Sequence, residues 1–312
     1  MPDRASSLGP LRLGTRRSPL AIAQAEEARA RLIAAHGLAP GDIELVPVLA
    51  SGDRIQDRPL AEIGGKALWT KELDAALLAG EIHFAVHSAK DVETIRPAEI
   101  ALAAILPRED VRDVLVGARS IATLPQGARV GTSAPRRAAQ LLNARPDCII
   151  VPFRGNVATR LARLAAGEAD ATLLAAAGLN RLGENGTGYP LPADQWLPAP
   201  GQGAIAIECR ANDPATLTLL AAIDDAPSRA AVVAERALLA ALGGTCHSAI
   251  AVLTTLAEGM LTLRAMLFSP DGKERIEGEA RFAPGDADAP ARLAEELLAQ
   301  ASPAIAVHFA GS

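Results

Sequence analysis

Short apolar runs alternate with longer amphipathic runs over the first hundred positions. The strand-like runs are 11–15, 43–49, 82–87 and 100–106. Helical spacing marks 68–79, and Ser18, Pro19 and Gly37 are suited to cap, open and end a helix after the first strand. This order is typical of βαβ units and predicts a mainly parallel sheet.

The same order of strands and helices starts again near Asp113. Strands are expected at 114–116, 128–131, 148–153 and 171–174, and helices at 135–143 and 157–166. Segments 13–18 and 130–137 share one order of features. In each, a predicted strand is followed by a Gly-Thr turn, then by a hydroxyl residue and Arg, and then by a predicted helix. We therefore expect two α/β domains of similar design, each with a helix N-terminus that can bind an anion.

The remaining third of the chain changes pattern. Segment 183–200 is rich in Gly and Pro and is expected to be a loop or hinge, and 204–208 to be a strand that returns to the first domain. Helices are expected at 213–223, 228–242 and 289–300, and alternating antiparallel strands at 249–256, 260–268 and 274–282. The predicted division is 1–104 with 201–222 as domain 1, 105–200 as domain 2, and 223–312 as an α+β domain 3.

Composition narrows the class of protein. The 312 residues are 49% hydrophobic and 21% charged, which suits a sizeable core in more than one domain. No run approaches the length of a membrane span without a charge, and the N-terminus has no apolar signal core. The net charge is −5, although 105–200 carries 11 basic and 8 acidic residues, and aromatic residues are only 3%. We therefore expect neither membrane nor nucleic acid as a partner.

Arginine side chains cluster around the predicted strand ends. The set comprises Arg16, Arg136, Arg137, Arg154, Arg160 and Arg181. Open α/β sheets bind ligands at the carboxyl ends of their parallel strands, and guanidinium groups bind carboxylate or phosphate in a planar fork. The set therefore predicts a polyanionic ligand, with solvated surface arginine as the alternative.

A polar cluster, Val86-His87-Ser88-Ala89-Lys90-Asp91, ends one predicted strand. A hydrolase triad is disfavoured, because neighbouring strand side chains point to opposite faces and no Gly-x-Ser-x-Gly elbow is present. An aspartate at a strand end beside cations is better suited to stabilising a developing positive charge. An ion pair between Asp91 and an Arg or Lys is the alternative.

The three cysteines lie in different surroundings. Their odd number and wide spacing predict neither a disulfide framework nor a metal site, and favour a reducing, cytoplasmic setting. Cys148 and Cys209 belong to apolar strands and are expected to be buried and inert. Cys246 lies in a Gly-rich turn beside His247, where a thiol can be a nucleophile, a covalent attachment point, or idle.

Two glycine-rich turns resemble phosphate-binding loops. They are Gly64-Gly65-Lys66 and Gly201-Gln202-Gly203. Neither has the full P-loop spacing, so each is a weak indication by itself.

Taken together, these stretches resemble the porphobilinogen deaminase (hydroxymethylbilane synthase) family from Leu11 to about Gln300. The most specific pieces are 13–20, 64–73, 85–92, 130–137, 154–160 and 197–210, with Cys246 downstream. The resemblance implies two α/β domains like those of a solute-binding protein, plus a small α+β domain that carries the cysteine. It also implies a transferase of tetrapyrrole (haem) biosynthesis, which joins four porphobilinogen units head to tail with loss of ammonia.

The resemblance further implies a monomer with a dipyrromethane cofactor held by a thioether to Cys246, and a catalytic Asp91. Substrate and cofactor carboxylates would be held by Arg16, Ser18, Lys66, Ser88, Lys90, Thr132, Arg136, Arg137, Arg154, Arg160, Arg181 and Gln202. Each porphobilinogen brings an acetate and a propionate, so the growing chain is a polyanion and suits this set. Trp69 and Ala134 stand where the family commonly has Phe and Ser.

A two-lobed anion receptor is the competing class of protein. It would need the arginine set but neither Asp91 nor Cys246. Such a receptor would carry no pyrrole adduct, so the mass of the intact protein distinguishes the enzyme from the receptor.

Overall fold

The computed structural model describes residues 10–50, 69–245 and 247–309. The chain divides into two compact units, each described by itself below. Among the described residues, unit 1 contains 10–50, 69–108 and 204–229, and unit 2 contains 109–203 and 230–309 apart from residue 246.

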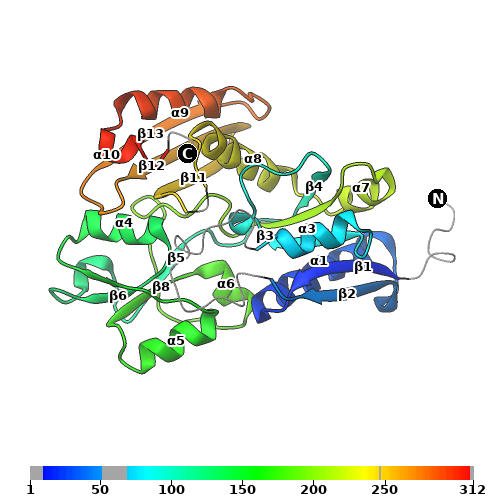
Figure 1. The fold of residues 1–312 in the computed structure, drawn as a ribbon, viewed down its shortest axis with the longest axis horizontal. Helices are drawn as coiled ribbons and strands as arrows, with labels where there is room; N and C mark the ends of the chain where they lie inside the picture. Colours follow the sequence, from blue (N-terminus) through cyan, green and yellow to red (C-terminus); the bar gives the residue numbers. More distant parts are fainter. Residues whose placement is uncertain (1–9, 51–68, 246, 310–312) are drawn as a thin grey trace. The chain divides into compact units, whose positions relative to one another are not determined.

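Unit 1 is built on a five-stranded mixed sheet of order β2-β1-β3-β10-β4 (Figure 1). Its strands are β1 (Leu11–Arg16), β2 (Ile43–Val48), β3 (Phe84–Ser88), β4 (Ile100–Ile105) and β10 (Ile205–Arg210). β1 pairs in parallel with β2 and β3, while β10 runs antiparallel between β3 and β4. The expected return of this segment to the first domain is confirmed. Since β10 is antiparallel to both of its neighbours, β4 runs in the same direction as β1, β2 and β3. Four of the five strands are therefore parallel in direction, as expected, and β10 is the exception.

Helices cover both faces of this sheet because its strands alternate. Phe84 and Val86 pack with α1 (Pro19–His36) and α7 (Pro214–Ala221), whereas Ala85 packs with α3 (Lys71–Leu78) on the other face. Ser18 caps α1 by accepting a hydrogen bond from Ala21 N (3.3 Å), and Gly37 ends it in the left-handed conformation (φ 65°). The predicted start and end of α1 are confirmed. Short 3₁₀ turns cover Pro40–Asp42 (η1) and Ala89–Asp91 (η3).

The first part of unit 2 repeats this architecture, with a mixed sheet of order β7-β6-β8-β5-β9. The strands are β5 (Asp113–Val116), β6 (Arg129–Gly131), β7 (Ile149–Val151), β8 (Ala171–Ala175) and β9 (Tyr189–Pro190). Again two parallel pairs adjoin an antiparallel strand, here β5. Figure 1 shows α4 (Pro135–Ala144) on one face, and α5 (Val157–Ala165) and α6 (Ala176–Arg181) on the other. A 3₁₀ turn, η4 (Ile121–Thr123), follows β5.

The prediction of a Gly-Thr turn is wrong in unit 1, where Gly14 and Thr15 lie within β1, whereas in unit 2 Gly131 ends β6. The glycine has the same structural reason in both units. A Cβ on Gly14 would collide with Ile82, and one on Gly131 would collide with the Phe153 ring. Each glycine therefore lets a neighbouring side chain close over the end of its strand. The threonines that follow, Thr15 and Thr132, are fully buried. The short sequence match thus reflects one local design used twice.

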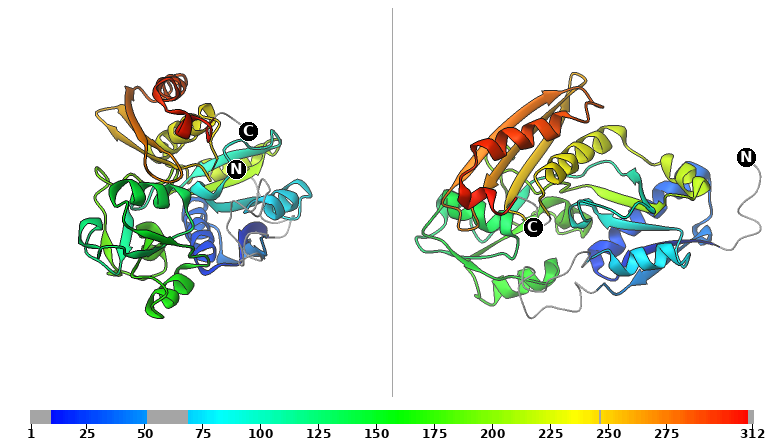
Figure 2. Two further views of the ribbon diagram at one scale, coloured as in Figure 1. Left: turned by 60° about the vertical axis from the view of Figure 1, so that its left-hand side comes forward. Right: turned by 45° about the horizontal axis from the view of Figure 1, so that its top comes forward.

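The second part of unit 2 is a three-stranded antiparallel sheet of β11 (Ile250–Ala257), β12 (Met260–Phe268) and β13 (Arg275–Phe282). Figure 2 shows α9 (Ala289–Gln300) lying along this sheet, with α8 (Ala226–Ala241) and α10 (Pro303–Ala306) contributing to the same core. The other face packs against Ala139 of α4 and Leu197. The α/β and α+β classes are as expected, whereas β9, α6 and α10 were not predicted. The three-domain division stays a prediction.

Candidate functional site

The centre of the candidate site in unit 1 is the pair Arg16 and Asp91. Arg16 is the last residue of β1 and Asp91 ends η3, directly after the parallel neighbour β3. Arg16 Nη1 lies 3.8 Å from Asp91 Oδ2, and the Asp91 side chain is 34% exposed. The strand order thus brings together two predicted site residues 75 positions apart. The ion pair that the sequence left open as an alternative is present, with the carboxylate still accessible.

Trp69 holds the Arg16 guanidinium from a second side. The guanidinium carbon lies 4.0 Å from the centre of the Trp69 ring, which is cation–π geometry. A planar, stacked guanidinium keeps its edge N–H groups directed outward in the ring plane. This aromatic partner was noted in the sequence only as a family departure.

The other predicted residues of unit 1 adjoin the same strand ends. Ser18 caps α1, and its hydroxyl accepts the hydrogen bond from Ala21 N. Ser88, the last residue of β3, exchanges hydrogen bonds with the Gln24 amide (2.9 and 3.1 Å). Lys90 lies in η3 next to Asp91. Lys66 lies outside the described residues.

In unit 2, three of the predicted ligand-binding residues converge on one buried acid, Asp113. Arg137 Nη2 donates to Asp113 Oδ1 at 2.7 Å, Gln202 Nε2 donates to the same oxygen at 2.9 Å, and Arg136 Nη1 donates to Oδ2. Trp196 Nε1 adds a fourth donor at 2.8 Å. The side chain of Asp113 is 0% exposed, so the two arginines compensate its charge inside the unit.

The charges in this cluster do not balance, since two guanidiniums face one carboxylate. Burial would raise the pKa of Asp113, but the charges of Arg136 and Arg137 and their hydrogen bonds hold it well below its usual range. Sequence reasoning missed Asp113. The sequence signal for this residue is an acidic residue at the start of the apolar strand Asp113-Val114-Leu115-Val116. An acid in such a strand is expected to be buried, and a buried carboxylate requires a cationic partner.

The remaining predicted residues of unit 2 lie at the ends of its strands and helices. Arg154 follows β7, and Arg160 lies in the first half of α5, where its Nε donates to Gly155 O at 3.0 Å. Arg181 ends α6 and donates to Gly203 O at 3.2 Å. Thr132 follows β6, and its hydroxyl accepts from Ala134 N at 3.2 Å.

The cysteines differ as expected where the structure describes them. Cys148 and Cys209 are buried, and burial raises the pKa of the Cys209 thiol to about 11. Both are therefore poor nucleophiles. Cys246 lies outside the described residues. In the described part of the chain, no three His, Cys, Asp or Glu side chains are grouped as a metal ion would require.

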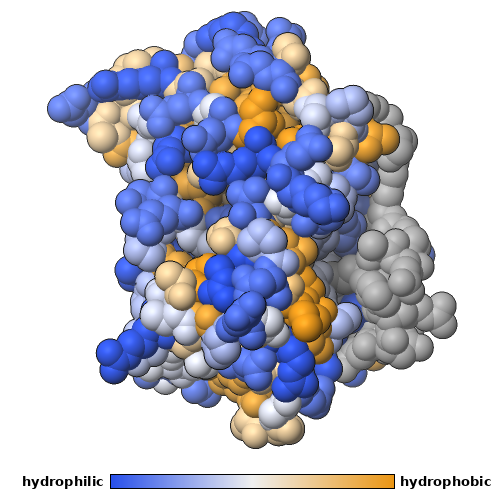
Figure 3. All heavy atoms as spheres, turned by 90° about the vertical axis from the view of Figure 1, so that its left-hand side faces the viewer, coloured by the Kyte–Doolittle hydropathy of each residue, from blue (hydrophilic) through white to orange (hydrophobic). Residues whose placement is uncertain are grey.

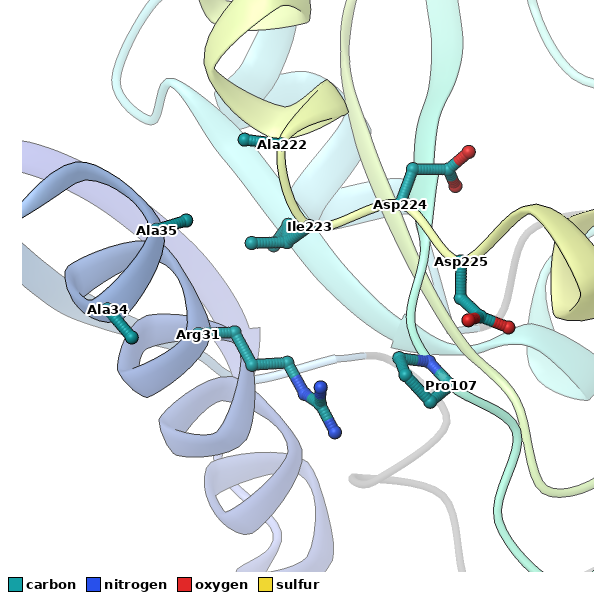
Figure 4. A pocket seen from close by; sticks show the side chains of 8 residues that line it. All are labelled: Arg31, Ala34, Ala35, Pro107, Ala222, Ile223, Asp224 and Asp225. Atoms are coloured by element: carbon teal, nitrogen blue, oxygen red, sulfur yellow. The ribbon is translucent and has the colours of Figure 1, made fainter.

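A surface pocket in unit 1 is lined by none of the predicted site residues. It is formed by α1 and by the segment that joins α7 to α8, and Figure 4 shows Arg31, Asp224 and Asp225 at its rim. Its polar groups already have partners: Arg31 bonds to Glu27, and Asp224 accepts from Ile105 N and Arg229. Asp225 accepts from Ser228 N. Each charged side chain at this pocket thus already has at least one partner within the unit.

On the face drawn in Figure 3, hydrophobic side chains occur in small groups among hydrophilic ones. None of the described helices combines the length and apolar character needed to cross a membrane.

Arginine-bearing strand-to-helix turns at the ends of two α/β sheets are the kind of site that binds carboxylates. Residues 11–218 match the family model for porphobilinogen deaminase, dipyromethane cofactor binding domain, and residues 229–299 match the porphobilinogen deaminase C-terminal domain. The chain belongs to the porphobilinogen deaminase family.

Curated relatives agree along the whole length. The porphobilinogen deaminase of Sphingopyxis alaskensis is 58% identical over 99% of this chain and 100% of its own. That of Paracoccus denitrificans is 51% identical over 96% of each chain. Among solved structures, a periplasmic substrate-binding protein from Coxiella burnetii aligns with 70% of this chain and 94% of its own, at 16% identity and a TM-score of 0.41.

The residues present fit the cofactor that the family's domain binds. At the N-terminal end of α4, Ser133 Oγ and Arg136 Nε are buried and have no hydrogen-bond partner among the described residues. A hydroxyl and a guanidinium N–H at a helix N-terminus are donors suited to a carboxylate. The acetate and propionate arms of a dipyrromethane are carboxylates, so the donor set and the cofactor are complementary.

Proposed function

We propose that this chain condenses four porphobilinogen units head to tail, with loss of ammonia, on a dipyrromethane primer to give hydroxymethylbilane. The observation that carries the proposal is the accessible Asp91 carboxylate beside Arg16 at the ends of β3 and β1, in a chain of this family. The reaction is a transferase reaction of the 2.5.1 type. We propose that the enzyme works as a cytoplasmic monomer and that the primer is held by a thioether to Cys246.

The role of Asp91 follows from the charge that the substrate develops. When the aminomethyl group of porphobilinogen leaves as ammonia, positive charge spreads over the pyrrole ring and its nitrogen. A carboxylate that accepts a hydrogen bond from the pyrrole N–H stabilises this charge more than it stabilises the neutral substrate. Asp91 has exposed oxygen surface for such a bond.

The cationic side chains hold the acid arms. Arg16 can donate hydrogen bonds to a substrate carboxylate from the edge of its guanidinium while the face of the guanidinium stays on Trp69. In unit 2, Arg154, Arg160 and Arg181 lie at strand and helix ends. When bound, the dipyrromethane supplies a nucleophilic pyrrole carbon and two further pairs of carboxylates. Arg136, Thr132 and Ser133 at the N-terminal end of α4 would hold one of these carboxylates, and Arg137 and Gln202 would keep Arg136 in place through Asp113.

The mass of the intact purified protein tests this function. We expect an adduct of two linked pyrroles on the wild type and none on Cys246→Ser, with Cys209→Ser as the matched control that keeps the adduct. An unmodified wild-type protein that still binds small polyanions would instead support the anion receptor.

A further inference from the structure

Arg96 is a buried arginine that the reaction scheme above does not use. It lies five residues after Asp91, in the segment between η3 and β4. Its neighbour Ile95 is 74% exposed, whereas the Arg96 side chain is only 10% exposed. The segment therefore runs along the surface and sends one charged side chain inward.

The guanidinium of Arg96 joins two elements of unit 1. Nε and Nη2 donate to the Glu208 carboxylate of β10 at 2.9 and 2.8 Å. Nη1 and Nη2 donate to the Asp74 carboxylate of α3 at 3.0 and 2.6 Å. Nη1 also donates to Thr70 Oγ1 at 3.3 Å. Two forks to carboxylates use four of the five N–H groups of the arginine, and the bond to Thr70 uses the fifth. Only a planar guanidinium can make this set of contacts.

Arg96 is also a cation that compensates these acids. The Glu208 side chain is 1% exposed and the Asp74 side chain 13%. His87 Nε2 lies 3.5 Å from Glu208, but burial, and then the charge of Arg96, lower the pKa of His87 to about 4. Neutral at physiological pH, His87 cannot share this role. Two buried carboxylates without a cation would cost several kcal/mol.

The same contacts bear on the turn that carries Asp91. At the start of η3, Ala89 N donates to Ala204 O next to β10, and Val92 N closes the turn onto Ala89 O. On the far side of Asp91, Arg96 ties the following segment to β10 and α3. Asp91 is thus held between two attachments to one strand, β10, which itself pairs with β3.

We propose that Arg96 is a positioning residue for Asp91: its two carboxylate forks hold the segment after η3 against α3 and β10 and so fix the Asp91 carboxylate at the end of β3. The inference rests on the proposed role of Asp91. A carboxylate that must meet one N–H loses much of its effect when its position shifts by about 1 Å.

The test is Arg96→Lys, alone and in an Asp91→Asn background. Lysine keeps the charge but cannot form the two forks. We expect kcat for porphobilinogen to fall about tenfold in the wild-type background, with KM changed less than about twofold. In the Asp91→Asn background, single-turnover addition of the first substrate should change less than about twofold, because the residue through which Arg96 acts is already lost.

Arg210→Lys is the matched control. Arg210 lies at the other end of β10 and donates to Leu77 O and Ile82 O, so it also joins β10 to the end of α3. We expect it to lower the unfolding temperature about as much as Arg96→Lys and to leave kcat unchanged. Equal losses of kcat in the two arginine variants would overturn the inference, because the effect would then be general destabilisation.

Two further outcomes separate a failure of the Arg96 proposal from a failure of the proposed role of Asp91. If Asp91→Asn is strongly impaired but Arg96→Lys lowers the single-turnover rate by the same factor in both backgrounds, the Arg96 proposal fails and the proposed function stands. If Asp91→Asn turns over normally, the role of Asp91 fails and that of Arg96 fails with it. Should Arg96→Lys not fold, the triple variant Arg96→Met, Glu208→Gln and Asp74→Asn removes both forks together with all three charges, and the same coupling to Asp91 is expected.

Discussion

The Asp91 carboxylate lies 3.8 Å from the Arg16 guanidinium, a separation that gives an ion pair without a direct hydrogen bond. The guanidinium is stacked on Trp69, which limits how far it can approach the acid. The Asp91 side chain therefore lies beside a cation and is still 34% exposed to a further donor. A group that is charged, accessible and fixed is what stabilisation of a transient substrate cation requires.

Asp91→Asn keeps the size of this side chain and removes its charge. We expect turnover of porphobilinogen to fall at least about a hundredfold, which is the scale of losing one preorganised electrostatic contact. The rate is measured as product formation at saturating substrate. Glu26→Gln is the control, because Glu26 pairs with Arg29 on the surface of α1 and its neutralisation should leave the rate unchanged. Near-normal turnover of Asp91→Asn would refute the assignment.

Sequence periodicity predicted most strands and helices, because burial on alternate faces is a local property. It could not predict the direction of β5 and β10, since strand direction depends on pairing with distant segments. The helix ends at Ser18 and Gly37 could be predicted, because a capping residue acts on the one helical turn next to it.

In the candidate site, too, local features could be predicted from the sequence and tertiary contacts could not. Asp91 and Arg16 were recognised from strand ends and from the family resemblance. That Arg136 and Arg137 face an acid 23 and 24 residues away was not recognised, because an ion-pair partner is a tertiary contact. Buried acids in apolar strands, such as Asp113 and Glu208, are the sequence signal that points to such partners.

Removing the charge of Asp113 should destabilise unit 2. Asp113→Asn leaves two buried guanidiniums without their counter-ion, and we expect a loss of about 3–5 kcal/mol in unfolding free energy. Trp196→Phe removes one neutral donor to the same carboxylate together with part of a buried ring, and the lost hydrogen bond should cost about 2 kcal/mol. Chemical denaturation of both variants measures the difference. A loss in Asp113→Asn no larger than in Trp196→Phe would show that the charge cluster contributes little.

His87 should make unit 1 less stable in acid. Burial, followed by the charge of Arg96, lowers the pKa of His87 to about 4 in the folded protein, against 6.5 for an unperturbed histidine. Between these values the unfolded chain binds a proton that the folded chain does not, so stability falls as the pH drops from about 6.5 to 4, by up to about 3 kcal/mol. Denaturation curves of wild type and His87→Leu over this range isolate the contribution. Parallel pH profiles of the two proteins would contradict it.

Arg154 and Arg160 should affect how far the pyrrole chain grows. Arg154 lies in the turn between β7 and α5, and Arg160 lies in the first half of α5, where its bond to Gly155 O orients it. Because each added unit brings two carboxylates, the loss of one guanidinium should matter more as negative charge accumulates. We expect Arg154→Gln and Arg160→Gln to show missing or shortened adducts in intact-mass spectra after substrate is added. Arg163→Gln is the control, since Arg163 stacks on Phe153 and pairs with Glu168 and its loss should leave the adduct series complete. Full-length product at the wild-type rate from the Arg154 and Arg160 variants would show that the acid arms are held elsewhere.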